Sequence, residues 1–137
     1  MRSGVDKTDI VLVYCAIIRS VLEYACQVWH CGLTKTQACE VENVQSRCLR
    51  IIYPALSYAD ALSVTGLDRL DDRRERMVHE LFNEVKGPGH ALNKSLSAYA
   101  VDSNKPVTRD TYPYKMPIAR TARLGRSFIA YCINKRM

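Results

Sequence analysis

The sequence lacks the features that would indicate a membrane protein or a secreted protein. Its longest apolar stretch, from Ile10 to Ile18, is interrupted only by the hydroxyl of Tyr14. That stretch is far shorter than the roughly 18–20 residues that a bilayer span requires. Arg19 and Glu23 would lie within a longer span, at a high energetic cost. The chain also has no small-residue cleavage site after this run, so we expect neither a membrane protein nor a secretory signal.

Cysteine is common in the sequence, but its spacing is not that of a structural metal site. Cys26, His30, Cys31 and Cys39 are the candidate ligands, and they lack the short paired spacing of zinc knuckles. A chain without a secretory signal is expected to keep its thiols reduced, where they behave as small apolar side chains. We therefore expect no metal, no cofactor, and a cytoplasmic or nuclear protein. The six cysteines are Cys15, Cys26, Cys31, Cys39, Cys48 and Cys132.

Motifs of catalysis are missing as well. The sequence has no glycine-rich phosphate loop, no HExxH and no GxSxG. Asp71 and Asp72 form a carboxylate pair of the kind that polymerases use to hold metal. Here they open an amphipathic segment, where the helix dipole favours negative charge. The sequence therefore predicts no catalytic site.

Acidic residues are scarce in the last third of the chain. Residues 1–86 contain 11 Lys and Arg against 12 Asp and Glu, whereas residues 87–137 contain 9 against 2. The first part is close to neutral, and the second is a basic arm. An excess of positive charge of this kind favours a polyanionic partner.

The remaining residues predict an all-α protein, a small helical bundle around a buried first helix. Residues 8–29 are apolar on nearly every face, which is typical of a helix that others surround. We expect Thr8 or Asp9 to cap this helix. We expect its interior side chains to include Leu12, Ala16, Leu22, Ala25 and Trp29.

Cap and stop signals predict the later helices. A capping box at Thr34 and Gln37 starts a helix that ends near Ile52. Another helix starts at Ser57 and runs to Thr65, where Gly66 stops it, and a longer one covers 68–86. A short helix is expected over 91–97, and a last turn over 128–134. The helix that starts at Thr34 is expected to have an apolar face of Val41, Val44, Cys48, Ile51 and Ile52. The long helix over 68–86 is expected to have an apolar face of Leu70, Met77, Val78, Leu81, Phe82 and Val85.

The prolines of residues 98–120 exclude a continuous helix there. We therefore expect a helical domain over residues 1–97 and a basic, mostly irregular arm over 98–137. Arginine recurs at every third position from Arg120 to Arg126, and the aromatic residues Tyr112, Tyr114, Phe128 and Tyr131 are interleaved with the basic residues of the arm. Lysine and arginine supply phosphate contacts and aromatic rings supply stacking, although the rings could instead pack the arm on its own domain. The candidate nucleic-acid-binding residues are Lys115, Arg120, Arg123, Arg126, Lys135 and Arg136.

A second basic cluster, of Arg69, Arg73, Arg74 and Arg76, has two interpretations. With Glu75, Glu80 and Glu84 close by, it could be a salt-bridged helix face. It could also face nucleic acid.

Three segments give a resemblance to a known family. Val21-Leu-Glu-Tyr-Ala-Cys-Gln-Val-Trp-His30, Gly32-Leu-Thr-Lys35 and Arg47-Cys-Leu-Arg-Ile-Ile-Tyr-Pro54 resemble the region after the catalytic palm in LINE-type, jockey-like reverse transcriptases of non-LTR retrotransposons. The segment from Arg120 to Ile129 is similar to the closing part of that family. The family usually has proline at the position of Gln27.

The resemblance implies a C-terminal segment of an RNA-directed DNA polymerase without the polymerase palm. We accordingly expect no polymerase activity from this chain, and RNA or DNA as its partner. Two alternatives remain open. One is a helical interaction module that binds the polymerase portion or another helical partner. The other is an inert remnant of a mobile element.

Overall fold

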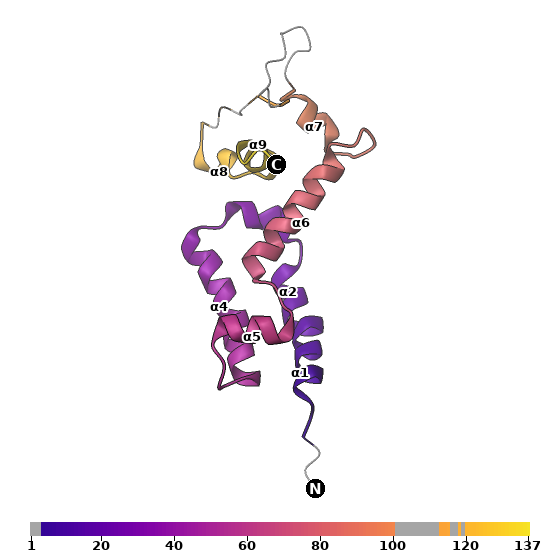
Figure 1. Ribbon diagram of the computed structural model, residues 1–137. Coiled ribbons are helices and arrows are strands. Elements are labelled where there is room, and N and C mark those ends of the chain that lie inside the picture. The colour runs from indigo at the N-terminus through magenta and orange to yellow at the C-terminus, as the bar shows by residue number, and fades with distance from the viewer. Residues whose placement is uncertain (1–3, 101–112, 116–117, 119) are drawn as a thin grey trace. The chain divides into compact units, whose positions relative to one another are not determined.

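The computed structural model describes residues 4–100, 113–115, 118 and 120–137 (Figure 1). The described residues form helices and contain no β-strand, only an isolated bridge between Ala100 and Tyr114, so the predicted all-α class is confirmed. No helix among them is both long and apolar enough to cross a membrane. The helices are α1 (Lys7–Val13), a π-helix (Tyr14–Arg19), α2 (Ser20–Glu23), α3 (Cys26–Trp29), a 3-10 helix (His30–Gly32), α4 (Lys35–Ile52), α5 (Tyr58–Thr65), α6 (Leu70–Val85), α7 (Asn93–Ser97), α8 (Ala122–Gly125) and α9 (Phe128–Asn134).

The chain divides into two compact units. Unit 1 consists of residues 1–26 and 33–75, and unit 2 of residues 27–32 and 76–137, so the division falls within α6. Unit 1 has 9 Lys and Arg against 10 Asp and Glu, whereas unit 2 has 11 against 4. The charge asymmetry of the sequence is therefore also an asymmetry between the two units.

The later cap signals in unit 1 act as the sequence predicts, whereas the expected cap of the first helix is wrong: α1 begins at Lys7, before Thr8 and Asp9, and Asp6 at its N-cap position makes no side-chain cap. The hydroxyl of Thr34 accepts a hydrogen bond from the Gln37 backbone, and the Gln37 side chain accepts one from the Thr34 backbone at 3.0 Å. Ser57 caps α5 in the same way by accepting from the backbone of Asp60. Gly66 ends α5 with φ 67°, a left-handed conformation that glycine adopts without a steric cost.

The expectation of one continuous, buried first helix is wrong. The helix is interrupted at Tyr24 and Ala25, where Ala25 has φ 48°. Leu12 is 62% exposed, Ala16 and Ala25 are also exposed, and Leu22 and Trp29 are only half-buried. The segment instead turns Tyr14 and Arg19 inward, because both find polar partners inside unit 1.

The expected buried face of α4 is wrong for Val44 and Ile51, whereas Val41 and Cys48 are half-buried and Ile52 is buried. The side chains that α4 buries are Glu42, Gln45, Leu49 and Ile52, which recur every three or four residues. Ile51 is 81% exposed, and Val44 is exposed too. Polar side chains occupy the inner face because they bond to residues far away in the sequence.

Unit 2 has an apolar core built on the second half of α6. The predicted stripe of that helix is confirmed, since Val78, Phe82 and Val85 are fully buried, and Leu96 from α7 and Ile133 from α9 pack with them. Phe82 is also in edge-to-face contact with Tyr114 and Phe128, with ring centroids 6.3 Å apart in each case. The short helix α9 thus belongs to a hydrophobic cluster.

Candidate nucleic-acid interface

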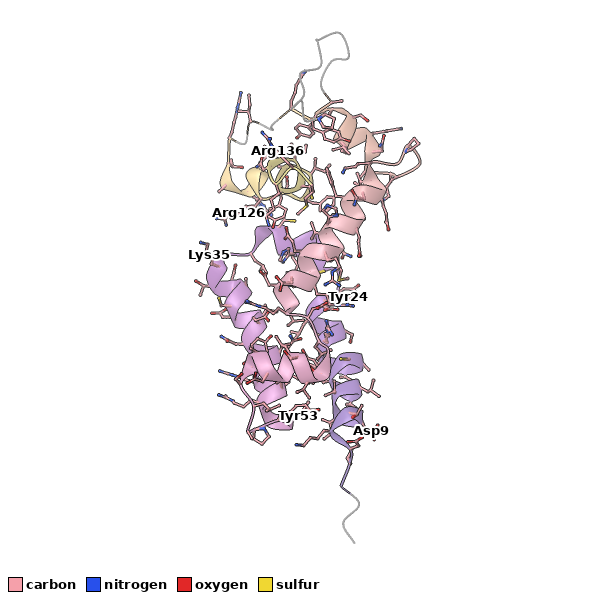
Figure 2. All side chains as sticks on the ribbon, in the orientation of Figure 1. Asp9, Tyr24, Lys35, Tyr53, Arg126 and Arg136 are labelled. Carbon is pink, nitrogen blue, oxygen red and sulfur yellow. The ribbon has the colours of Figure 1, made fainter. Side chains whose placement is uncertain are left out.

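The six basic residues singled out in the sequence all lie in unit 2, and all six side chains are exposed. Arg123 is on α8, and Arg126 follows its last residue. Lys135 and Arg136 follow α9 in the same way. Figure 2 shows Arg126 at the end of α8 and Arg136 beside α9. Two short helices therefore present four of the six cations, and Lys115 and Arg120 lie outside the helices.

Local structure explains how these positions are held. The hydroxyl of Thr121 caps α8 by accepting from the Leu124 backbone at 3.2 Å. Lys115 donates its backbone N–H to the carbonyl of Tyr99 at 2.6 Å, next to the bridge between Ala100 and Tyr114. These bonds hold the backbone beside Arg123 and at Lys115, and the side chains of both residues are exposed.

Charge neutralisation inside this set is small. Among the described residues, no carboxylate forms an ion pair with Arg120, Arg123, Arg126 or Arg136. The ammonium of Lys135 lies 4.9 Å from the centroid of the Tyr131 ring, a cation–π contact that keeps the charge at the surface. The positive charge of these four arginines is therefore available to an external anion.

The aromatic residues of the tail pack inward. Phe128 contacts Phe82, and Tyr131 contacts His30 edge-to-face at 6.4 Å. Tyr114, Phe128 and Tyr131 are half-buried against the core of unit 2. Tyr112, which the sequence also suggested for stacking, lies outside the described residues. The described rings thus favour the packing interpretation of the aromatic residues, and the arginines remain as the external contacts.

In the second basic cluster, Arg69, Arg73 and Arg74 form ion pairs within unit 1. The Arg73 guanidinium lies 2.8 Å from the carboxylate of Glu23, which also pairs with Arg19 at 3.0 Å. Arg74 is fully buried, 3.6 Å from the carboxylate of Asp71. This geometry supports the salt-bridged interpretation of the cluster. Asp71 and Asp72 lie in the first turn of α6, the helix-start position that the sequence suggested.

Sequence reasoning missed a buried polar network in unit 1. The hydroxyl of Tyr14 donates to the Gln45 side chain at 2.8 Å, and the Gln45 amide donates at 3.0 Å both to the hydroxyl of Tyr58 and to the carbonyl of Asp68. Tyr58 donates to one carboxylate oxygen of Glu42. The other oxygen of Glu42 accepts from the backbone N–H of residue 71 at 3.1 Å. The network joins four segments of unit 1.

The network changes the acidity of its two phenols. Burial, together with the hydrogen bond to Glu42, raises the pKa of Tyr58 to about 12. Burial raises the pKa of Tyr14 as well. Both hydroxyls therefore stay protonated and act as donors at neutral pH. A cavity of about 400 Å³ adjoins Glu42 and Tyr58. Both carboxylate oxygens of Glu42 already accept hydrogen bonds from the protein, so this carboxylate has a structural role.

The candidate zinc ligands do not form a cluster. All six cysteines are free thiols. Within the described part of the chain, no three side chains of His, Cys, Asp or Glu lie close enough together to hold a metal ion. Cys26, His30 and Cys31 are buried, and Cys39 is exposed on α4.

In comparisons with known proteins, no family model, no curated protein and no solved structure matches the chain. The assignment of function therefore depends on the site geometry and on the sequence resemblance.

Proposed function

We propose that this chain is a non-catalytic C-terminal segment of a non-LTR retrotransposon reverse transcriptase, and that it binds RNA or DNA through unit 2. The observation that carries this proposal is the set of exposed cations on and around α8 and α9. Four of its arginines have no carboxylate partner among the described residues. Arginine suits the task because its planar fork can hold two phosphate oxygens.

The proposed contacts are made to phosphate and carry no base specificity. The described aromatic rings of the C-terminal arm, Tyr99, Tyr114, Phe128 and Tyr131, pack against the core of unit 2, so they do not supply the stacking that reads unpaired bases. Phosphate contacts of this kind position the nucleic acid without reading its sequence. Binding should therefore depend strongly on salt and weakly on sequence.

Filter binding across a salt series tests the proposal. Each phosphate contact to a single strand contributes about −0.7 to the slope of log K against log salt. Changing Arg120, Arg123 and Arg126 together to Gln should therefore flatten the slope by about 2 and weaken all sequences alike.

A matched control variant removes the same charge from unit 1. Lys35, Arg47 and Arg50 are exposed on α4, and their triple Gln variant has the same net charge as the test variant. Its slope should stay close to that of the wild type. Equal slopes for the wild type and the two variants would retire the nucleic-acid proposal.

We further propose that the chain by itself does not polymerise. Metal-assisted phosphoryl transfer needs carboxylates that converge on two metal ions about 4 Å apart. Asp71 is the strongest candidate, but its carboxylate faces Arg74 at 3.6 Å. Primer extension by the purified protein above the level of a boiled control would contradict this. A cytoplasmic or nuclear location belongs to the same proposal.

A second candidate function, a helical interaction module, is favoured by a different observation. Apolar side chains of α1 and the π-helix are exposed, including Leu12, Ile17 and Val21. Such side chains lower the free energy when a partner covers them.

A further inference from the structure

The cavity beside Glu42 and Tyr58 lies between α4 and the segment that contains α5 and the start of α6. Its volume of about 400 Å³ is within the range of pockets that hold small organic ligands. Ala38 of α4 and Ala59 and Leu62 of α5 give it apolar walls. The described residues that line it all belong to unit 1, so its geometry is set within one compact unit. We call it the α4–α5 cavity.

The charges at the α4–α5 cavity balance. The carboxylate of Glu42 lies 3.7 Å from the Arg69 guanidinium, and that of Asp71 lies 3.6 Å from the Arg74 guanidinium. A charged ligand placed among these matched pairs would have no opposite charge left to meet. Burying a charge without a partner is costly. The cavity therefore favours an uncharged ligand.

Two polar side chains of the cavity have hydrogen-bonding capacity to spare. Asn43 and Ser46 lie one turn apart on the same face of α4. Within the described part of the chain, neither the Asn43 amide nor the Ser46 hydroxyl forms a hydrogen bond. The amide of Asn43 offers a donor and an acceptor side by side, so a second amide can meet it with two hydrogen bonds. These groups favour a ligand that has a donor and an acceptor on one edge.

The remaining lining residues constrain the shape of the ligand. The side chain of Arg69 is 59% exposed, so it lies at the rim of the cavity. A guanidinium is planar and stacks on the face of an aromatic ring. The alanine and leucine walls offer no partners to the hydroxyl groups of a sugar, which would lose their hydration without compensation. A flat ring fits both features better than a polyol does.

We propose that the α4–α5 cavity binds a small, uncharged aromatic carboxamide, or a heterocycle with the same donor and acceptor edge. The Asn43 amide pairs with the carboxamide of the ligand, and the Ser46 hydroxyl donates to its carbonyl oxygen. The ring of the ligand lies against Ala59 and Leu62, and the Arg69 guanidinium covers its outer face. This site goes beyond the nucleic-acid proposal and does not depend on it, because the cations of that proposal lie in unit 2.

Titration of benzamide into the isotope-labelled chain, followed by NMR, tests the site. Benzamide should bind saturably with a dissociation constant of about 1 mM or below, and should shift the backbone signals of α4 and α5. Benzoate and benzylammonium should each bind at least about fivefold more weakly, because they bring an unpaired charge into the cavity. Cyclohexanecarboxamide keeps the amide but lacks the flat ring, and should bind at least about threefold more weakly.

Two variants with matched controls locate the site. Asn43→Leu removes the amide at similar volume and should raise the dissociation constant of benzamide at least about fivefold. Asn134→Leu removes an exposed amide of α9 in unit 2, and its constant should stay within about twofold of the wild type. Ala59→Phe fills the cavity and should abolish binding, whereas Ala55→Phe lies outside the cavity and should not. Circular dichroism verifies that the variants fold, and Asn43→Leu decides the matter if Ala59→Phe does not, since Asn43 is exposed.

Three results would overturn the proposal. One is the absence of saturable benzamide binding up to about 10 mM, which would show that the cavity does not take this class of ligand. Another is equal affinity for benzamide, benzoate and benzylammonium, which would contradict the argument from balanced charge. The third is an unchanged dissociation constant for Asn43→Leu, which would place the ligand elsewhere. The salt series described above tests the nucleic-acid proposal separately.

Discussion

The two units differ in which side chains they bury and which they expose. Unit 2 has an interior of apolar side chains, around Phe82 and Ile133, and a surface rich in arginine and lysine. Unit 1 buries a carboxylate, an amide and two arginines beside apolar side chains such as Leu49 and Leu70, and leaves several isoleucine, leucine and valine side chains exposed. Burial of apolar area is non-directional, whereas a hydrogen-bonded network requires particular partners. We infer that the burial of apolar area contributes most of the stability of unit 2. In unit 1 the geometry of the hydrogen-bonded network determines how the segments pack.

The largest effect should come from the core of unit 2. Phe82→Ala removes a fully buried ring that contacts Tyr114 and Phe128, and should lower the free energy of unfolding by about 3–5 kcal/mol. Urea denaturation measures the loss. Ile118→Ala, at a side chain that is 90% exposed, provides the control and should change little. Equal losses for the two variants would mean that Phe82 is not central.

A smaller effect is expected in the network of unit 1. Glu42→Gln keeps the shape of the side chain but leaves one acceptor oxygen for two donors, the Tyr58 hydroxyl and the backbone N–H of residue 71. The loss should be about 1–3 kcal/mol, again from urea denaturation. Glu40→Gln changes an exposed carboxylate on the same helix and should be close to neutral. If both changes were neutral, the network would not stabilise unit 1.

High pH should destabilise unit 1 through the buried phenol of Tyr58. Burial, and then the bond to Glu42, raises the pKa of Tyr58 to about 12, against about 10 in an unfolded chain. Above about pH 10 the unfolded chain loses this proton while the folded chain keeps it, so the free energy of unfolding falls as the pH rises. Unfolding curves at increasing alkaline pH measure this fall. Tyr58→Phe should make it shallower, whereas Tyr24→Phe removes an exposed hydroxyl and should not.

The smallest effect concerns the first helix. Leu12→Ala should change the free energy of unfolding by less than about 0.5 kcal/mol, because its side chain is 62% exposed. Leu49→Ala, at a fully buried leucine of α4, should cost about 2–5 kcal/mol. Comparable losses at the two positions would restore the first helix as an interior element.

The sequence was sufficient for features that depend on near neighbours. The capping box at Thr34, the αL stop at Gly66 and the stripe of α6 are all properties of a few consecutive turns, and all three are confirmed. The inner face of α4 could not be found in the same way. Glu42 and Gln45 are buried because Tyr14, Tyr58 and the backbone near Asp68 satisfy them, and those partners come from other segments.

The candidate interface could be predicted from its positive charge, because lysine and arginine can be read directly from the sequence. Its six cations are exposed, and their surroundings could be anticipated only in part. The packing of Phe128 on Phe82 joins positions 46 residues apart in the sequence, which periodicity within a helix cannot reveal. The first helix was misjudged for a related reason, since hydrophobicity alone does not say whether a neighbour is present to cover it.

At Ala25, where the first helix is interrupted, the side-chain methyl group strains the backbone, and its removal should relieve that strain. At φ 48° the Cβ of a residue crowds the backbone, at a cost of about 1–2 kcal/mol, whereas glycine adopts this conformation freely. Glycine also gives the unfolded chain more freedom, which offsets about 0.4–1 kcal/mol of that gain. Ala25→Gly should therefore be neutral or mildly stabilising. Changes to larger side chains there should retain the strain, so residue 25 should tolerate a smaller side chain better than a larger one.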